Sequence, residues 1–245
     1  MIPLGVVASG RTGSWTPAVL PGLAAWYDAA AAATLTLSGS TVTAWSDKSG
    51  AGMHVTQAST GPTRGTATLA GTPVLTFGGS HRLRRAGTAL MPAAGTISVV
   101  MRVNTTALPT YLGQPFSLTA GNQPAPADHW HYGPGLNNLF AGMPDQNQEW
   151  HPLRSQSTWG VLTTARKLVA GTASAQQWFQ GSSVLARSWS SSAWRMADQA
   201  LCVGQRDDGV VQFVGDLAEI VVTNTWISDA DRGALESYLR AKWGI

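Results

Sequence analysis

The sequence predicts an all-β fold, a sandwich of short antiparallel strands that ends in a single helix. Strand-like segments alternate with Gly-, Ser- and Asp-rich turns along most of the chain. One helical pattern is too few for repeated strand–helix–strand units, which excludes a parallel α/β fold. With 245 residues, the chain is long enough to bury a large core without disulfides or a structural metal.

The strands are predicted from alternating patterns and from short apolar runs that end at turn residues. Residues 96–103 are apolar enough for a central strand that is buried on both faces. A hairpin is expected where Gly181 and Ser182 separate two strand-like segments. About ten strands are expected in all, and they include residues 41–46, 73–77, 96–103, 158–164, 167–172, 176–180, 184–188, 200–204 and 216–222.

Three segments do not follow the strand pattern. Residues 1–21 mix Gly, Ser, Thr and Pro without a sustained period, so we expect an extended N-terminal arm, followed by one domain at residues 22–245. The alanine run at residues 29–33 favours a short helical turn. Residues 108–153 form an irregular insert rich in Pro, Asn, Gln and aromatic residues, and a loop of that length is usually functional.

The C-terminal helix is predicted from its ends and from its apolar stripe. The Ser228 hydroxyl can accept from a backbone N–H of the first turn, and Asp231 places negative charge at the positive end of the helix dipole. Gly244 ends the helix. One face must pack on an apolar surface such as the strand at residues 216–222, because four apolar residues recur at helical spacing: Leu235, Tyr238, Leu239 and Trp243.

Sequence landmarks lie at both ends of the chain: PGLAAWYDAAAAATLTLSGSTVTAWSDKSGAGMHVTQ, GTPVLTFGGSHRL and GDLAEIVVTNTWISDADRGALESYLRAKWGI. They resemble the concanavalin A-like (LamG-like) jelly-roll domains of bacteriophage virion and prophage proteins, which also occur in some bacterial surface proteins. The resemblance covers residues 21–245 and implies a jelly-roll β-sandwich with the C-terminal helix packed on it. The start, LGVVASGR, is similar to the N-termini of phage-encoded proteins with this domain. Such domains serve as lectins, hydrolases, adhesion modules and virion parts, so the resemblance specifies function less than fold.

Composition excludes several classes of function. Only 12% of the residues are charged, about half the usual share, so Ser, Thr, Asn and Gln must supply most of the surface polarity. The basic run at residues 81–85 lacks an accompanying aromatic-rich basic stripe, so we expect no nucleic acid partner. No segment has the length and apolarity of a membrane span or the pattern of a signal peptide, so we expect no membrane partner and synthesis in the host cytoplasm. Cys202 is the single cysteine and is expected to be buried.

No catalytic constellation is visible in the sequence, which favours a non-enzymatic protein. Glycoside hydrolysis needs two carboxyl groups that flank the sugar bond, and the chain has three glutamates, Glu149, Glu219 and Glu236. Asp216 and Glu219 are three residues apart on one predicted strand, so they are expected on opposite faces of it. The chain also lacks the Gly-x-Ser-x-Gly motif that presents a serine nucleophile.

The insert carries the most informative candidate residues. Aromatic rings beside hydroxyl and amide groups can stack on sugars or anchor a protein partner, and the sequence does not separate these two roles. The candidate glycan- or partner-binding surface comprises His129, Trp130, His131, Tyr132, Asn137 and Trp150. A metal site built on its histidines would need a third ligand at a suitable spacing, so surface-loop roles are favoured for them. Four other tryptophans are expected in the core because they lie in the landmarks: Trp26, Trp45, Trp226 and Trp243.

Calcium is the ion that the resemblance suggests, because lectin-like and laminin-type jelly rolls often bind it. A calcium site needs several oxygen ligands from loops. Asp207 and Asp208 are the candidate ligands, although Asp-Asp-Gly is also a common hairpin turn. Asp28 and Asp47 are expected to cap turns through bonds from their carboxylates to backbone N–H groups. We expect no cofactor apart from calcium at this candidate site.

The leading hypothesis is a non-enzymatic bacteriophage virion structural protein: a head decoration, a head fibre or a tail-associated component. The arm at residues 1–21 would bind other virion proteins, exposed loops would contact host-surface glycans, and symmetric sites on a virion favour a homo-oligomer. The expected location is the virion. The alternative is a carbohydrate-binding adhesion module for host attachment, with Trp130, Tyr132 and Trp150 as its site. A polysaccharide depolymerase is the third hypothesis.

Overall fold

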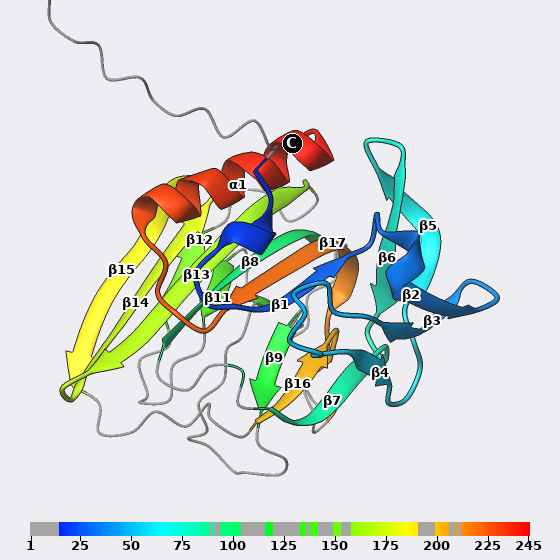
Figure 1. Cartoon of the computed structure of the whole chain (residues 1–245), viewed down its shortest axis with the longest axis horizontal. Helices are drawn as coiled ribbons and strands as arrows, with labels where there is room; N and C mark the ends of the chain where they lie inside the picture. The colour runs from blue at the N-terminus through cyan, green and yellow to red at the C-terminus, as the bar shows by residue number, and fades with distance from the viewer. Residues whose placement is uncertain are drawn as a thin grey trace, which may run out of the picture.

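The computed structural model describes residues 15–88, 90, 94–103, 116–119, 133–135, 138–141, 149–152, 158–190, 199–205, 209 and 212–245. These residues form an antiparallel β-sandwich with one α-helix, α1 (Asp229–Trp243), on its outer face (Figure 1). The predicted all-β class with a C-terminal helix is therefore confirmed. No helix among the described residues has the length and apolarity needed to cross a membrane.

The first layer of the sandwich carries the helix. Its strands run in the order β15 (Ser182–Ser190), β14 (Thr172–Phe179), β13 (Gly160–Val169), β8 (Ala94–Val103) and β17 (Val214–Thr223). On its other side, β17 pairs with β6 (Thr72–Gly78) along its first residues and with β1 (Leu23–Asp28) along its last. All these pairs are antiparallel, so short turns join β13, β14 and β15 into a meander.

The second layer closes the other side of the core. It runs through β3 (Thr41–Trp45), β4 (Val55–Gln57), β7 (Leu83–Thr88), β16 (Gln199–Val203) and β9 (Phe116–Thr119), while β2 (Leu35–Ser38) pairs with β3. Strand β5 (Thr63–Leu69) pairs with both β6 and β3 and so links the layers. A separate small sheet contains β10 (Gly133–Gly135), β11 (Asn138–Ala141) and β12 (Glu149–Pro152).

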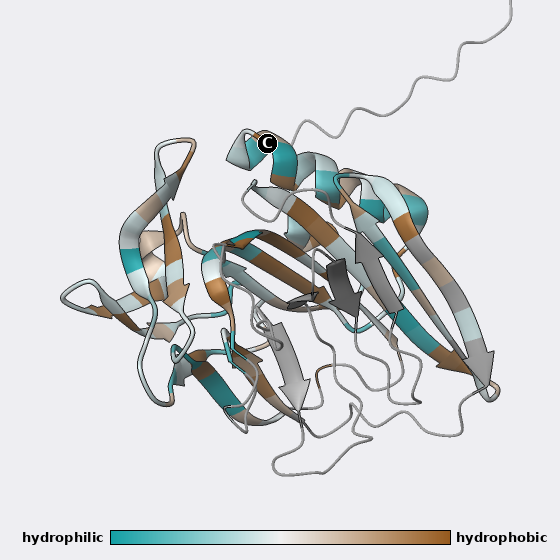
Figure 2. Ribbon diagram, turned by 180° about the vertical axis from the view of Figure 1, so that it is seen from behind, coloured by the Kyte–Doolittle hydropathy of each residue, from teal (hydrophilic) through white to brown (hydrophobic). Residues whose placement is uncertain are grey.

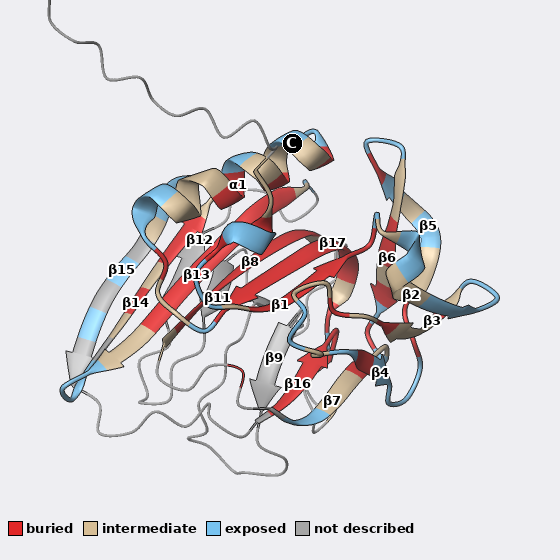
Figure 3. Ribbon diagram, in the orientation of Figure 1, coloured by how far each residue is buried: buried red, intermediate tan, exposed pale blue. Residues whose placement is uncertain are grey.

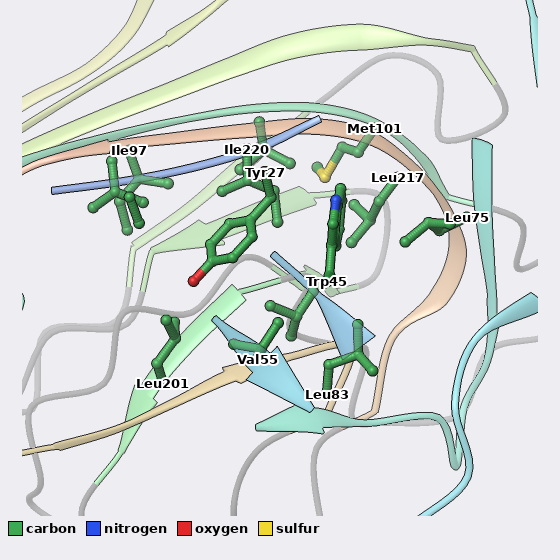
Figure 4. Packing of buried hydrophobic residues seen from close by; sticks show 14 of the residues in the cluster. Tyr27, Trp45, Val55, Leu75, Leu83, Ile97, Met101, Leu201, Leu217 and Ile220 are labelled. Atoms are coloured by element: carbon green, nitrogen blue, oxygen red, sulfur yellow. The ribbon is translucent and has the colours of Figure 1, made fainter. Parts of the chain in front are cut away.

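The main core lies between the two layers. Tyr27, Ile97 and Leu217 come from the first layer, and Trp45 and Leu201 come from the second; Figure 4 shows these side chains converging. All five are fully buried or nearly so, and burying a large apolar side chain contributes about 1.5–3 kcal/mol. The central strands β8 and β17 are buried on both faces (Figure 3), as predicted for residues 96–103.

The helix covers the outer face of these strands, so both of their faces are buried. Leu235, Leu239 and Trp243 pack on Val161 and Val221, which lie on the outer face of the first layer. In Figure 2 the central strands are mostly brown, whereas α1 carries teal residues, as expected for an amphipathic helix.

The ends of α1 are capped as the sequence predicts. The Ser228 hydroxyl accepts a 3.1 Å hydrogen bond from the Asp231 N–H at the N-terminal end. Gly244 adopts a left-handed conformation with φ of 65° and closes the C-terminal end. Capping and packing together hold the helix on the first layer.

Two predicted boundaries differ from the structure. The segments 158–164 and 167–172 are one strand, β13, which ends at a turn formed by Ala170 and Gly171 with φ values of 48° and 78°. Positive φ at both central residues gives the tight hairpin turn whose twist matches paired strands. The same geometry at Gln180 and Gly181 joins β14 to β15, so the predicted hairpin is confirmed with its turn one residue earlier.

The described end of the N-terminal arm packs on the domain. Residues 15–21 include a short 3₁₀ helix, Pro17–Val19. Leu20 is 5% exposed and joins the apolar cluster under α1, and the Trp15 ring lies 5.7 Å from the Tyr238 ring. Residues 1–14 lie outside the described residues, so the proposed arm boundary at residue 21 stays a prediction.

Candidate functional site

Most of the predicted site residues lie outside the described part of the chain: His129, Trp130, His131, Tyr132, Asn137, Asp207 and Asp208. Trp150 lies in β12, where its backbone pairs with Phe140 of β11. The glycan surface in the insert and the calcium site at Asp207 and Asp208 therefore stay predictions. No cluster of three His, Cys, Asp or Glu side chains that could hold a metal ion occurs among the described residues.

The described residues form a shallow pocket on the helix-bearing face of β13, β14 and β15. Its cavity volume is about 340 Å³. Val161 packs against the helix, and residues 163, 165 and 167 of the same strand follow it in alternation, so Lys167 projects from that face. Its lining residues are Lys167, Ser174, Gln176, Ala186, Ser188 and Trp226, and Trp226 belongs to the loop that leads into α1.

Trp226 forms the aromatic wall of this pocket. Its loop is pinned at both sides by Thr96, whose hydroxyl donates to the Thr225 carbonyl at 3.0 Å and accepts from the Ile227 N–H at 3.3 Å. The ammonium nitrogen of Lys167 lies 4.7 Å from the centroid of the indole ring, a cation–π contact. The pinned loop therefore fixes the indole beside a cation.

The expectation that Trp226 belongs to the core is wrong. Trp26, Trp45 and Trp243 are 7%, 0% and 1% exposed, as predicted, but Trp226 is half-buried and lines the pocket. The sequence contains a signal for this difference, because Trp226 follows the polar residues Asn224 and Thr225, after the apolar run of β17 has ended. A tryptophan in such a polar loop does not need a place in the core.

The floor of the pocket is polar. Ser174 and Gln176 on β14 lie opposite Ser188 and Ala186 on β15, and the hydroxyls of Ser174 and Ser188 are 2.9 Å apart. Hydroxyl and amide groups donate and accept hydrogen bonds. An aromatic face beside such groups can hold a ligand that has both an apolar ring face and many hydroxyls, which describes a sugar.

A second set of polar groups is buried between α1 and the first layer. Asp28 and Glu219 are paired across β1 and β17, and they are 3% and 0% exposed. Lys242 of α1 joins them, with its ammonium nitrogen 2.8 Å from Asp28 Oδ1 and 2.6 Å from Glu219 Oε2. Lys48 lies 2.6 Å from Asp28 Oδ2. We call these four residues the charge cluster.

Tryptophans complete the charge cluster. The indole N–H of Trp26 donates to Glu219 Oε1 at 2.7 Å, and that of Trp243 donates to Glu219 Oε2 at 2.6 Å. Burial raises the pKa of Glu219, the negative charge of Asp28 adds to this effect, and Lys242 opposes it. Burial also acts to raise the pKa of Asp28, but hydrogen bonds from Lys242 and Lys48 outweigh it and lower that pKa. The cluster is electrically balanced and ties the helix to the sheet.

The alternation expected for Asp216 and Glu219 is wrong. The register of β17 shifts between Leu217 and Glu219, and this bulge returns both carboxyls to the helix-bearing face. Asp216 is held by Arg102 at 2.7 Å and by the Thr76 hydroxyl at 2.7 Å, whereas Glu219 belongs to the charge cluster. Both carboxyls are fully buried and engaged by separate partners, so this geometry does not present them to a bound sugar.

Asp47 organises a turn, as expected. Its carboxylate accepts from the N–H groups of Trp26, Ser49 and Met53 at 2.8–3.0 Å and from the Ser49 hydroxyl at 2.7 Å. Asp28 also accepts from the Ala30 N–H at 3.0 Å, but its main partners are the two lysines of the charge cluster. The ion pairs of Asp28 with Lys48 and Lys242 join residues that are far apart in the sequence, so the local sequence around Asp28 does not predict them.

Comparison with known proteins identifies the fold. No family model and no curated protein sequence matches the chain. A similar solved structure is domain 4 of AbnA, an extracellular GH43 arabinanase from Geobacillus stearothermophilus, in complex with arabinotriose. It has a TM-score of 0.61 and 13% identity, over 89% of this chain and 99% of that one.

Two further structures are similar over less of their own length. An arabinofuranosidase complexed with arabinofuranosyl-α-1,2-xylobiose matches 83% of this chain with a TM-score of 0.60 and 18% identity. A Trypanosoma rangeli sialidase in complex with the inhibitor DANA matches 88% of this chain with a TM-score of 0.61 and 10% identity. The match spans 51% of the arabinofuranosidase and 32% of the sialidase.

These matches contradict the expectation of a non-enzymatic protein, because the structures that share the fold come from glycoside hydrolases. That expectation is therefore corrected. At 10–18% identity, the similarity itself is one of fold. The chain has the β-sandwich fold that is found in carbohydrate-active proteins.

Proposed function

We propose that the protein binds glycans, and that the pocket lined by Trp226 is a binding site. The observation that carries this proposal is the pairing of a half-buried indole with a floor of hydroxyl and amide groups in one cavity of about 340 Å³. Structures of the same fold come from carbohydrate-active proteins, one of them with arabinotriose bound, which supports the proposal.

The roles of the lining residues follow from their chemistry. The indole of Trp226 stacks on the C–H face of a sugar ring, which buries apolar area without requiring a hydrogen bond. Ser174, Ser188 and Gln176 exchange hydrogen bonds with the ring hydroxyls. The pocket is shallow and lies on an open sheet face, so we propose that it takes part of a polysaccharide chain rather than a fully enclosed small molecule.

A glycan array, followed by titration of the best ligand, tests this function with three proteins. Wild type is expected to bind, and Trp226→Ala is expected to lose at least about tenfold in affinity, or about 1.4 kcal/mol. Trp15→Ala is the matched control. Trp15 is another half-buried tryptophan, but it contacts Tyr238 of α1 and does not line the pocket. Equal binding by Trp226→Ala and wild type would exclude this pocket.

We also propose a virion setting for this glycan binding, on the strength of the sequence landmarks at residues 21–57, 71–83 and 215–245. Residues 1–14 are then the anchor to other virion proteins. Residues 15–21 are left out of the deletion, because Pro17 and Leu20 are buried against the domain. A deletion of residues 1–14 is expected to abolish incorporation into particles, measured by mass spectrometry of purified virions. Normal occupancy after the deletion would contradict an anchoring arm.

A further inference from the structure

The described residues that line the pocket include one charged side chain and no acid. Of its lining residues, Lys167 is the charged one, and the others are serines, an alanine, a glutamine and a tryptophan. The salt bridges that join described residues involve Lys48, Arg102, Arg232 and Lys242 as their cations. Lys167 contacts the indole of Trp226 instead. Among the described residues, the Lys167 ammonium group therefore has no carboxylate partner in the pocket.

The acids on the neighbouring helix are engaged elsewhere, and Asp231 accepts from the Ser228 hydroxyl at 2.7 Å. Arg232 of α1 lies 4.5 Å from the ring of Trp178, which is on β14 two residues beyond the pocket residue Gln176. Its guanidinium binds Asp229 at 3.4 Å and Glu236 at 3.1 Å, so these two acids are already engaged. The described lining of the pocket consequently carries a net positive charge.

From this geometry we infer that the pocket binds an acidic saccharide, with the sugar's carboxylate at the Lys167 ammonium and its ring on the Trp226 indole. The inference rests on the proposed glycan binding and adds the class of sugar. An acid group attached directly to a sugar ring keeps anion and ring close together, and the Lys167 ammonium lies over the Trp226 indole, 4.7 Å from its centroid. A neutral sugar would leave the cation without an anionic partner in the bound state. Charge-assisted hydrogen bonds are about twice as strong as neutral ones.

The test compares two ligands with the same sugar rings: a galacturonic acid trisaccharide with free carboxylates and its fully methyl-esterified form, which carries no charge. Isothermal titration is carried out with wild type, Lys167→Met, Lys167→Arg and Arg64→Gln. Arg64 lies on β5, which is distant from β13 in the sheet order, and its variant removes one positive charge outside the pocket. A sialylated and a sulfated oligosaccharide, titrated beside them, distinguish the kind of acid that fits.

Wild type is expected to bind the free acid at least about tenfold more tightly than the ester, and salt raised from about 50 to about 500 mM should reduce that ratio. Lys167→Met should abolish the preference for the free acid and still bind the ester. Lys167→Arg and Arg64→Gln should retain the preference for the free acid. Equal binding of acid and ester by wild type, or a preference that survives in Lys167→Met, would overturn the acidic-sugar inference and leave glycan binding standing. A Trp226→Ala variant that binds both ligands as wild type does would overturn the proposed site itself.

Discussion

Replacing Lys242 by methionine removes the cation that lies between the two buried carboxyls of the charge cluster. Lys242 contacts Asp28 at 2.8 Å and Glu219 at 2.6 Å, and its side chain is 21% exposed. In the variant, Asp28 keeps Lys48, but Glu219 keeps only the two indole N–H groups. Removing one partner of a buried ion pair costs about 3–5 kcal/mol. Because two indole donors remain, we expect a loss of about 3 kcal/mol in the free energy of unfolding at neutral pH.

The loss should depend on pH. Burial raises the pKa of Glu219 even with Lys242 present, and loss of the cation raises it further. A carboxyl with a raised pKa in the folded state favours folding at low pH, and that contribution is lost as the pH rises through the folded value. The variant's deficit should therefore be largest at neutral pH and shrink as the pH falls toward the raised pKa of Glu219, where the carboxyl takes up a proton.

Asp28 gives the opposite dependence in the wild type. Its pKa is lowered by Lys242 and Lys48, so its contribution is present above the unfolded pKa and is lost as the pH falls through the folded value. Lys242→Met removes part of this contribution as well. Both effects make the difference in free energy of unfolding between wild type and variant largest at neutral pH.

Urea denaturation at about pH 7 and about pH 5 measures the effect. Lys48→Met is the matched control: Asp28 is the one carboxyl of the cluster that Lys48 contacts, and the Lys48 side chain is 26% exposed, so its loss should be about 1 kcal/mol. The double variant Lys242→Met/Glu219→Gln should lose less free energy of unfolding than the two single variants lose in sum, because it no longer contains the unpaired carboxylate. A Lys242→Met loss below about 1 kcal/mol, or one that is the same at both pH values, would refute the reasoning.

Three further predictions concern single side chains, and each is measured as a change in the free energy of unfolding. Asp47→Ala should cost about 2–3 kcal/mol, because three backbone N–H groups lose their acceptor; a change below about 0.5 kcal/mol would contradict that role. Gly204→Ala should cost about 3 kcal/mol, since φ is 90° and the added Cβ would lie 2.2 Å from Cδ1 of the buried Phe77; wild-type stability would be the opposing result. Trp226→Ala should cost only about 1 kcal/mol, because its loop is pinned by Thr96 and its ring is half-buried; a much larger loss would show that the ring acts mainly as core.

The fold could be predicted because its signals are local. Ser228 and Gly244 mark the ends of α1, and the apolar run at residues 96–103 marks a strand with two buried faces. The β13–β14 turn was missed because Ala170 has a positive φ that alanine rarely adopts, so its residue type does not predict the turn. Gly171 beside it was the available signal.

The charge cluster could not be predicted in the same way. Asp28, Glu219 and Lys242 are far apart in the sequence, and their contacts depend on the pairing of β1 with β17 and on the bulge in β17. A bulge changes which face a side chain occupies, and simple alternation does not report it. The pocket could not be predicted for the same reason, because it combines residues of β13, β14, β15 and the loop before α1.

The most direct test of glycan binding at this pocket is an NMR titration that follows the tryptophan indole N–H signals. The Trp226 signal is assigned by its absence in Trp226→Ala, and the galacturonic acid trisaccharide is added to the wild-type protein. We predict a saturable shift of the Trp226 signal while those of the buried Trp45 and Trp243 stay in place. Saturable shifts confined to Trp130 and Trp150, with Trp226 unchanged, would contradict the pocket and return the glycan site to the insert.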